Sequence, residues 1–221
     1  MPTVDLLERF SFLAAMPAVA GIFITTGILV VVREWRLNVT ALAVQYFFVV
    51  LLLTRMIRPE VAAVKGLIGW MICMVFYLTE RQASMIEHSP TDEGKGASQR
   101  LSRWVMSAQA SFHLLAGLLV SVAAYAAALS IPLPEEVPAD ITLACYLMAG
   151  LGLLLIGLNE TPMQVGLGLL TFLSGFDLLY AALEPSLAVA GLLGAVSFLI
   201  ALAMAYLRVV QIAASGKERS A

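Results

Sequence analysis

The chain has 221 residues, of which 61% are hydrophobic and 13% are charged, and its formal net charge is −2. Its mean hydropathy is +0.92, whereas soluble domains are roughly half apolar and about a quarter charged, so the composition excludes a soluble domain and indicates an integral membrane protein. The apolar residues form continuous runs instead of short alternating segments, which predicts an all-α fold and excludes a membrane β-barrel.

Seven apolar runs are close to the ~20 residues that a helix needs to cross a bilayer, so seven transmembrane helices are expected. The first run follows Asp5, Glu8 and Arg9 and has no small-residue cleavage pattern, and we interpret it as a retained helix instead of a signal peptide. The expected helices are about 10–32, 37–54, 61–79, 104–131, 141–158, 165–183 and 187–210.

The connections between these runs divide the chain into modules. The last three runs are joined by only a few polar residues each, so their helices should pack as antiparallel neighbours. The longest polar stretch is rich in Ser, Gly, Thr and charge and is interpreted as a surface loop or short interfacial helix. The expected parts are a first three-helix module (1–79), a cytoplasmic polar loop (80–103), a linking helix with an outer acidic turn (104–138), a second three-helix module (139–212) and a cytoplasmic tail (213–221).

Basic residues predict the orientation, because Lys and Arg stay preferentially on the cytoplasmic side. Of the 13 Lys and Arg residues, nine fall on the side that receives the C-terminus, three fall on the other side, and Lys65 lies within a run. The N-terminus is therefore expected outside the cell and the C-terminus in the cytoplasm.

A shift of 126 positions lays the first three runs over the last three. It places Pro59 on Pro185 and Glu34 on Glu160, and it matches the lengths of the connections. An additional helix between two triplets restores the orientation of the second triplet. The sequence therefore predicts a 3+1+3 arrangement with parallel three-helix repeats.

Three ionisable residues within the runs are candidates for a proton relay. Lys65 would cost at least ~2.5 kcal/mol near the bilayer centre unless it faces a partner or a polar cavity, or extends its long stem to the outer interface. Asp177 lies roughly 10 Å from the outer connection by helical rise. It could carry protons or pair with Lys65 or Arg55. His113, about nine residues into its helix and so near the middle, could be a relay or an interhelical hydrogen-bonding group.

Other residues are assigned to helix boundaries and packing. Cys73 and Cys145 lie inside apolar runs without the spacing of metal ligands, so no metal centre or other cofactor is expected. The interfacial candidates are Glu34, Glu160, Arg55 and Arg58, for which simple solvation is the alternative. Gln45, Tyr46, Gln109 and Gln164 are interpreted as polar groups that join helices, and Gly150, Gly152, Gly157, Gly166 and Gly168 as sites of close helix approach.

Arg36-Leu37 at the start of the second run, and Lys65 in a helix ending near residues 79–81, are features of a known family. The last three runs have short connections and a basic end, and in this respect the chain resembles subunit K of complex I type NADH-quinone oxidoreductases. Outside 80–103 it looks like component E of hydrogenase-4 complexes. The resemblance implies a non-catalytic subunit in a proton path of a bacterial or archaeal inner membrane. The implied partners are antiporter-like and quinone- or hydrogenase-module chains and the lipid bilayer, not nucleic acid.

The chain also departs from that family. Subunit K carries membrane-embedded glutamates on its second and third helices, whereas the sixth run here offers Ser174 and Asp177, and the last run has no ionisable residue over 187–207. Two alternatives therefore stay open. One is a stand-alone small-solute transporter similar to the 3+1+3 sugar-efflux SWEET carriers, and the other is a membrane assembly or accessory protein.

Overall fold

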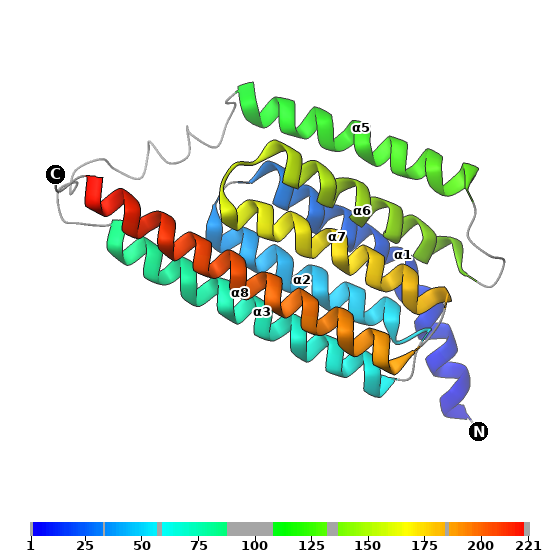
Figure 1. Cartoon of the computed structure of the whole chain (residues 1–221). Helices are drawn as coiled ribbons and strands as arrows, with labels where there is room; N and C mark the ends of the chain where they lie inside the picture. The colour runs from blue at the N-terminus through cyan, green and yellow to red at the C-terminus, as the bar shows by residue number, and fades with distance from the viewer. Residues whose placement is uncertain are drawn as a thin grey trace.

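The structure of the chain is a computed structural model, shown in Figure 1, and its described part is almost entirely helical. The described backbone comprises residues 2–32, 34–56, 59–87, 108–131, 137–183 and 186–218. Side-chain surroundings are described for 17–32, 34–56, 61–85, 111–131, 137–183, 186 and 188–214.

Seven helices and no strand occur in these residues, which confirms the all-α prediction. Proline opens α3 and α7, a position it favours because the first N–H groups of a helix need no intrahelical partner. The helices are α1 (Pro2–Val31), α2 (Trp35–Leu53), α3 (Pro59–Glu87), α5 (Ala108–Ser130), α6 (Ala139–Leu158), α7 (Pro162–Leu183) and α8 (Leu187–Glu218).

Six of the seven helices contain a segment of 19 to 27 residues that is long and apolar enough to cross a membrane. In α1, the apolar segment among residues with described side chains is Pro17–Val31. The chain thus has the helices of a multi-pass membrane protein, as its composition predicts.

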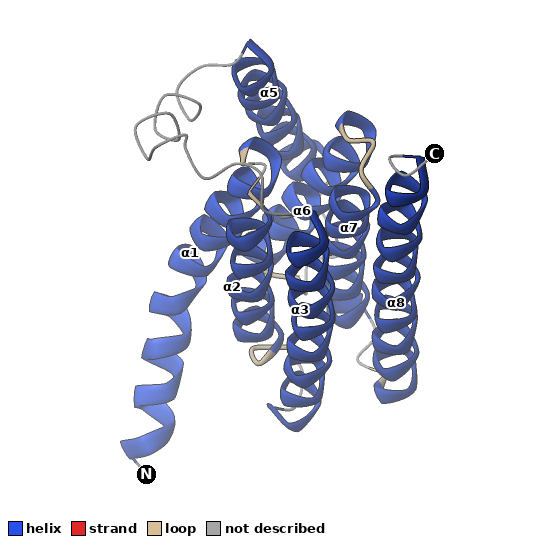
Figure 2. Cartoon of the chain, turned by 90° about the vertical axis from the view of Figure 1, so that its left-hand side faces the viewer, coloured by secondary structure: helices blue, strands red, loops and turns tan. Residues whose placement is uncertain are grey.

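The helices form two layers with α5 outside them (Figures 1 and 2). In one layer α2 lies between α1 and α3, and in the other α7 lies between α6 and α8. Across the layers α1 packs against α6, α2 against α7 and α3 against α8, and Figure 1 shows each of these pairs running in the same direction. Helix α5 packs against α6 and α1.

Several helices extend beyond their expected limits. Helix α3 continues to Glu87, although its end is expected at residue 79, and α8 continues to Glu218 instead of ending near residue 210. The additional residues are mostly good helix formers, and an ion pair between Glu80 and Arg208 joins the two helices near these ends. Part of the expected polar loop, residues 80–87, is therefore helical. Residues 88–107, which include the expected start of the fourth helix, lie outside the described residues.

Helices α6 and α7 approach until their backbones touch. A Cβ atom on Gly152 would lie 2.7 Å from the Phe172 nitrogen and 2.9 Å from the Gly168 oxygen, and one on Gly168 would lie 2.9 Å from the Gly152 oxygen. The prediction of close approach is confirmed for these two glycines. It is wrong for Gly157, whose added Cβ would meet nothing within 4 Å.

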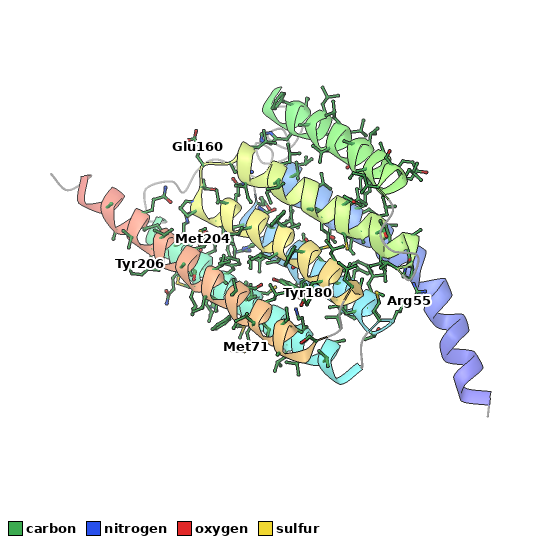
Figure 3. All side chains as sticks on the ribbon, turned by 45° about the vertical axis from the view of Figure 1, so that its right-hand side comes forward. Arg55, Met71, Glu160, Tyr180, Met204 and Tyr206 are labelled. Atoms are coloured by element: carbon green, nitrogen blue, oxygen red, sulfur yellow. The ribbon has the colours of Figure 1, made fainter. Side chains whose placement is uncertain are left out.

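Two apolar clusters make up the core, one toward each end of the bundle. We call the ends the Arg55 end, where α2 ends and α6 begins, and the Glu160 end, where α6 ends and α7 begins (Figure 3). The first apolar cluster, at the Arg55 end, includes Ile22, Val49, Leu52, Ala62, Met148 and Leu178. The second apolar cluster, at the Glu160 end, includes Leu29, Leu42, Ile72, Phe76, Leu155, Leu167 and Leu170.

Candidate functional site

Polar side chains occupy the gap between the two apolar clusters on four helices. On α7, for example, the second cluster ends at Leu170, the first resumes at Leu178, and Thr171, Ser174 and Asp177 lie between them. The same break occurs on α1, α2 and α3. We call the group the polar layer, and it consists of Thr25, Thr26, Gln45, Tyr46, Lys65, Thr171, Ser174 and Asp177.

An ion pair between Lys65 of α3 and Asp177 of α7 is the only pair of opposite charges in the polar layer as described. Each residue lies six positions from the nearer end of its helix, hence about 9 Å along the helix axis. Their side chains are 9% and 16% exposed, so both charges are largely removed from solvent. Of the two partners considered for Asp177, the structure selects Lys65 instead of Arg55.

Hydroxyl groups adjoin this ion pair on the side toward the second apolar cluster. Tyr46 of α2 lies near Ser174 and Asp177 of α7 and near Cys73 of α3, and its buried hydroxyl has no hydrogen-bond partner among the described residues. Ser174 also donates a hydrogen bond of 2.8 Å to the Leu170 carbonyl one turn back in its own helix. Because hydroxyls both donate and accept hydrogen bonds, these two groups can extend the polar surroundings of the carboxylate.

The threonines of the polar layer differ in how their hydroxyls are satisfied. Thr25 and Thr26 of α1 donate to carbonyls of the preceding turn, with distances of 2.8 Å to Gly21 and 2.7 Å to Ile22. Thr171 of α7 has no hydrogen-bond partner for its hydroxyl in the described part of the chain. These three residues were not predictable from the sequence, because a threonine hydroxyl in a membrane helix usually bonds its own backbone and gives no separate signal.

Arg55 forms a second ion pair, with Asp140 at the start of α6. Its Nη1 lies 2.6 Å from Asp140 Oδ2, and the two side chains are 23% and 17% exposed. Arg55 lies at the boundary of the bundle, as Figure 3 shows and as its interfacial assignment requires. The pair joins α2 to the second layer. Asp140 was missed because a carboxylate in the first turn of a helix is ordinarily a solvated group that complements the helix dipole.

A third ion pair joins α3 to α8 near the Glu160 end. Arg208 Nε lies 2.9 Å from Glu80 Oε1, and the Glu80 side chain is only 4% exposed. Arg208 also donates a hydrogen bond of 3.4 Å to Gln211. The carboxylate is thus buried against its partner while the guanidinium extends toward the boundary.

Arg208→Gln should lower the free energy of unfolding by about 1–2 kcal/mol, because it leaves the buried Glu80 carboxylate without its charged hydrogen-bond donor. Arg55→Gln is the matched control. It removes the more exposed ion pair with Asp140, which should contribute at most about 1 kcal/mol to the free energy of unfolding. The measurement is the free energy of unfolding in mixed micelles, followed by circular dichroism as SDS is added. An equal cost for both variants would mean that burial of Glu80 contributes nothing.

The remaining candidates lie outside the polar layer. His113 is buried on α5, but neighbouring Gly117 packs beside Val30 and Leu151 at the edge of the second apolar cluster, so His113 lies still nearer the Glu160 end. Its position near the middle of the membrane and its relay role stay predictions. Glu34 and Glu160 are exposed, which suits solvated boundary groups, and Glu160 is visible at its end in Figure 3. Arg58 lies outside the described residues.

The site thus combines one largely buried ion pair with nearby hydroxyl groups inside an apolar bundle. In the described residues no three His, Cys, Asp or Glu side chains are grouped as metal ligands would be. Comparisons with protein-family models, with curated proteins and with solved structures find no match to this chain.

Proposed function

We propose that the chain is a non-catalytic membrane subunit of a complex I or group 4 hydrogenase type oxidoreductase, and that its polar layer moves protons. The observation that carries the proposal is the largely buried Lys65–Asp177 pair at a break in the apolar core. Ionisable groups inside membrane bundles are costly and are typically found on ion or proton pathways. The resemblance to subunit K and component E supports the same assignment.

The chemistry of the pair suits proton transfer. A proton accepted by an Asp177 carboxylate oxygen removes the charge that holds the Lys65 ammonium, so protonation and release of the pair are coupled. Tyr46 and Ser174 lie beside Asp177 and can each accept one proton while donating another. Redox chemistry would then belong to partner chains.

Broad apolar surfaces support a position among other membrane subunits. The window of α5 that could cross a membrane is 11% buried, and those of α8 and α3 are 22% and 28% buried. The exposed residues of α5 include Leu115, Leu119 and Leu129. In the proposed complex, lipid and neighbouring antiporter-like or hydrogenase-module chains cover these surfaces.

The proposal includes the 3+1+3 arrangement with parallel repeats. The 126-residue shift brings the start of α2 to within one residue of the start of α7, and that of α3 to within two residues of the start of α8. With the N-terminus outside and the C-terminus in the cytoplasm of a bacterium or archaeon, the Arg55 end faces outward. The Lys65–Asp177 pair then lies in the outer half of the membrane and Glu80–Arg208 in the inner half.

A stand-alone transporter is the second candidate, and one observation favours it. Equivalent helices of the two triplets face one another, with polar groups of α2 and α7 between them. Carriers that rock two repeats about a central site have this arrangement. Uptake of a small solute by the purified chain in liposomes, in the absence of other subunits, would support this candidate.

Asp177→Asn should lower proton translocation at least about tenfold while electron transfer falls less, since a positioned proton carrier typically contributes ~10²–10⁴-fold. Lys65→Ala should act in the same direction. The test isolates the chain with its co-purifying subunits, reconstitutes them in liposomes and compares dye-detected acidification with electron transfer. Asp140→Asn, in the boundary pair, is the matched control and should leave coupling intact.

Two outcomes would count against the proposal. Unchanged coupling in both Lys65→Ala and Asp177→Asn would remove the proton-transfer role and leave a scaffold. Isolation of the chain without any redox or antiporter-like subunit would remove the assignment to an oxidoreductase.

A further inference from the structure

Two side chains of the polar layer are fully buried and lack hydrogen-bond partners. Both amide atoms of Gln45 and the hydroxyl of Thr171 have none among the described protein atoms. The two residues are 1% and 0% exposed. A buried polar group without a hydrogen bond costs about 1–3 kcal/mol, so a dry interior would be penalised at both positions.

These side chains belong to helices that pack together and run in the same direction, α2 and α7. Tyr46 lies near Ser174, and both residues fall in the break between the two apolar clusters, so they lie at a similar level of the bundle. Gln45 precedes Tyr46 by one residue and Thr171 precedes Ser174 by three, so the helical rise places both within about 3 Å of the same level. The 126-residue shift also relates Gln45 to Thr171.

We propose that ordered water binds between α2 and α7 and bridges the Gln45 amide to the Thr171 hydroxyl. A buried water typically makes about three hydrogen bonds, and the Gln45 amide alone supplies donors and an acceptor that face no protein partner. The first and second apolar clusters lie on either side and confine the water to this level.

This water site goes beyond the proposed function, because water would bind here whether or not protons move through the chain. It adds hydrogen-bonding groups to the polar layer on the side of Asp177 that faces the Glu160 end. It also assigns Gln45 and Thr171 a role in binding a small polar ligand, water, instead of a direct contact between helices.

The test follows exchange of a thiol proton for deuterium by infrared spectroscopy of the full chain in lipid nanodiscs. Thr171→Cys, made with Cys73→Ala and Cys145→Ala, places a thiol of similar volume at the site. Leu167→Cys in the same background is the control, because Leu167 lies one turn away in the second apolar cluster and an apolar cavity there stays dry. The thiol at position 171 should exchange at least about tenfold faster than the control, since it does not wait for the bundle to open.

Equal exchange rates at positions 171 and 167 would overturn the water site. If the cysteine variants fold poorly, a second measurement tests the same site. It is the thermal unfolding midpoint of the Gln45→Leu variant. If the amide binds water, the midpoint falls, because the water and Thr171 lose partners. An unchanged or higher midpoint would mean that the amide is dry and would also overturn the site. Neither measurement depends on proton translocation, so failure of the water site and failure of the proposed function are distinguishable.

Discussion

Asp177→Asn is expected to lower the free energy of unfolding by about 3–5 kcal/mol, because it leaves the Lys65 ammonium inside the bundle without its counter-charge. Asparagine keeps the shape of aspartate, so the cost reflects the missing charge instead of a cavity. Lys65→Met should cost a similar amount by leaving the carboxylate alone. The measurement is the free energy of unfolding in mixed micelles, followed by circular dichroism as SDS is added.

The double variant Lys65→Met/Asp177→Leu should recover to within about 1 kcal/mol of the original chain, because replacing a buried ion pair by apolar groups is often neutral or stabilising. The double variant Arg55→Gln/Asp140→Asn is the matched control, because it replaces the ion pair at the boundary of the bundle. There each single variant should lower the free energy of unfolding by about 1 kcal/mol or less. Strictly additive costs for Lys65→Met and Asp177→Leu would contradict a direct interaction between the two residues.

Recovery in the double variant would also bear on function. A pair that can be replaced by apolar groups without loss of stability is not required to hold α3 and α7 together. Its presence inside an apolar bundle then needs another cause, and proton transfer through Asp177 is the one proposed here. A double variant that is stable but uncoupled would separate the two roles of the pair within a single protein.

Helix positions were predictable from the sequence where the hydrophobic length decides them. The expected starts and ends of α2 and α6 lie within two residues of those observed, because an apolar run bounded by charge or proline is a local signal. The end of α3 was not predictable in this way. The helix continues to Glu87, and the first residue of this continuation, Glu80, pairs with Arg208, which is 128 residues away in the sequence. No local sequence pattern indicates such a partner.

The candidate site was predictable only in part for a similar reason. Lys65 and Asp177 stand out because charge is rare in an apolar run, but packing decides that they pair with each other. Thr171 gives no such signal, because its significance depends on the helix that faces it. Gln45 was interpreted as a group that joins helices, yet its amide has no protein partner among the described residues.

Gly152→Ala should lower the free energy of unfolding by about 3 kcal/mol, near the top of the range for overpacking. The added methyl would lie 2.7 Å from the Phe172 nitrogen and 2.9 Å from the Gly168 oxygen, and both are backbone atoms that cannot turn aside. Helices α6 and α7 would have to separate, and this is the closest backbone approach among the described glycines. Unfolding by SDS is again the measurement.

Gly157→Ala on the same helix is the matched control, because its added methyl would meet nothing within 4 Å. Alanine favours helix over glycine, so the free energy of unfolding should be unchanged or raised by up to about 1 kcal/mol. The two glycines are five residues apart on one helix. A lower free energy of unfolding for Gly152→Ala and a higher one for Gly157→Ala would show that the α6–α7 contact, and not helix propensity, explains the cost at Gly152. Because Asp177 and Ser174 lie on α7, separation of these helices should also alter the position of the polar layer. A Gly152→Ala variant as stable as Gly157→Ala would contradict the close packing of α6 against α7.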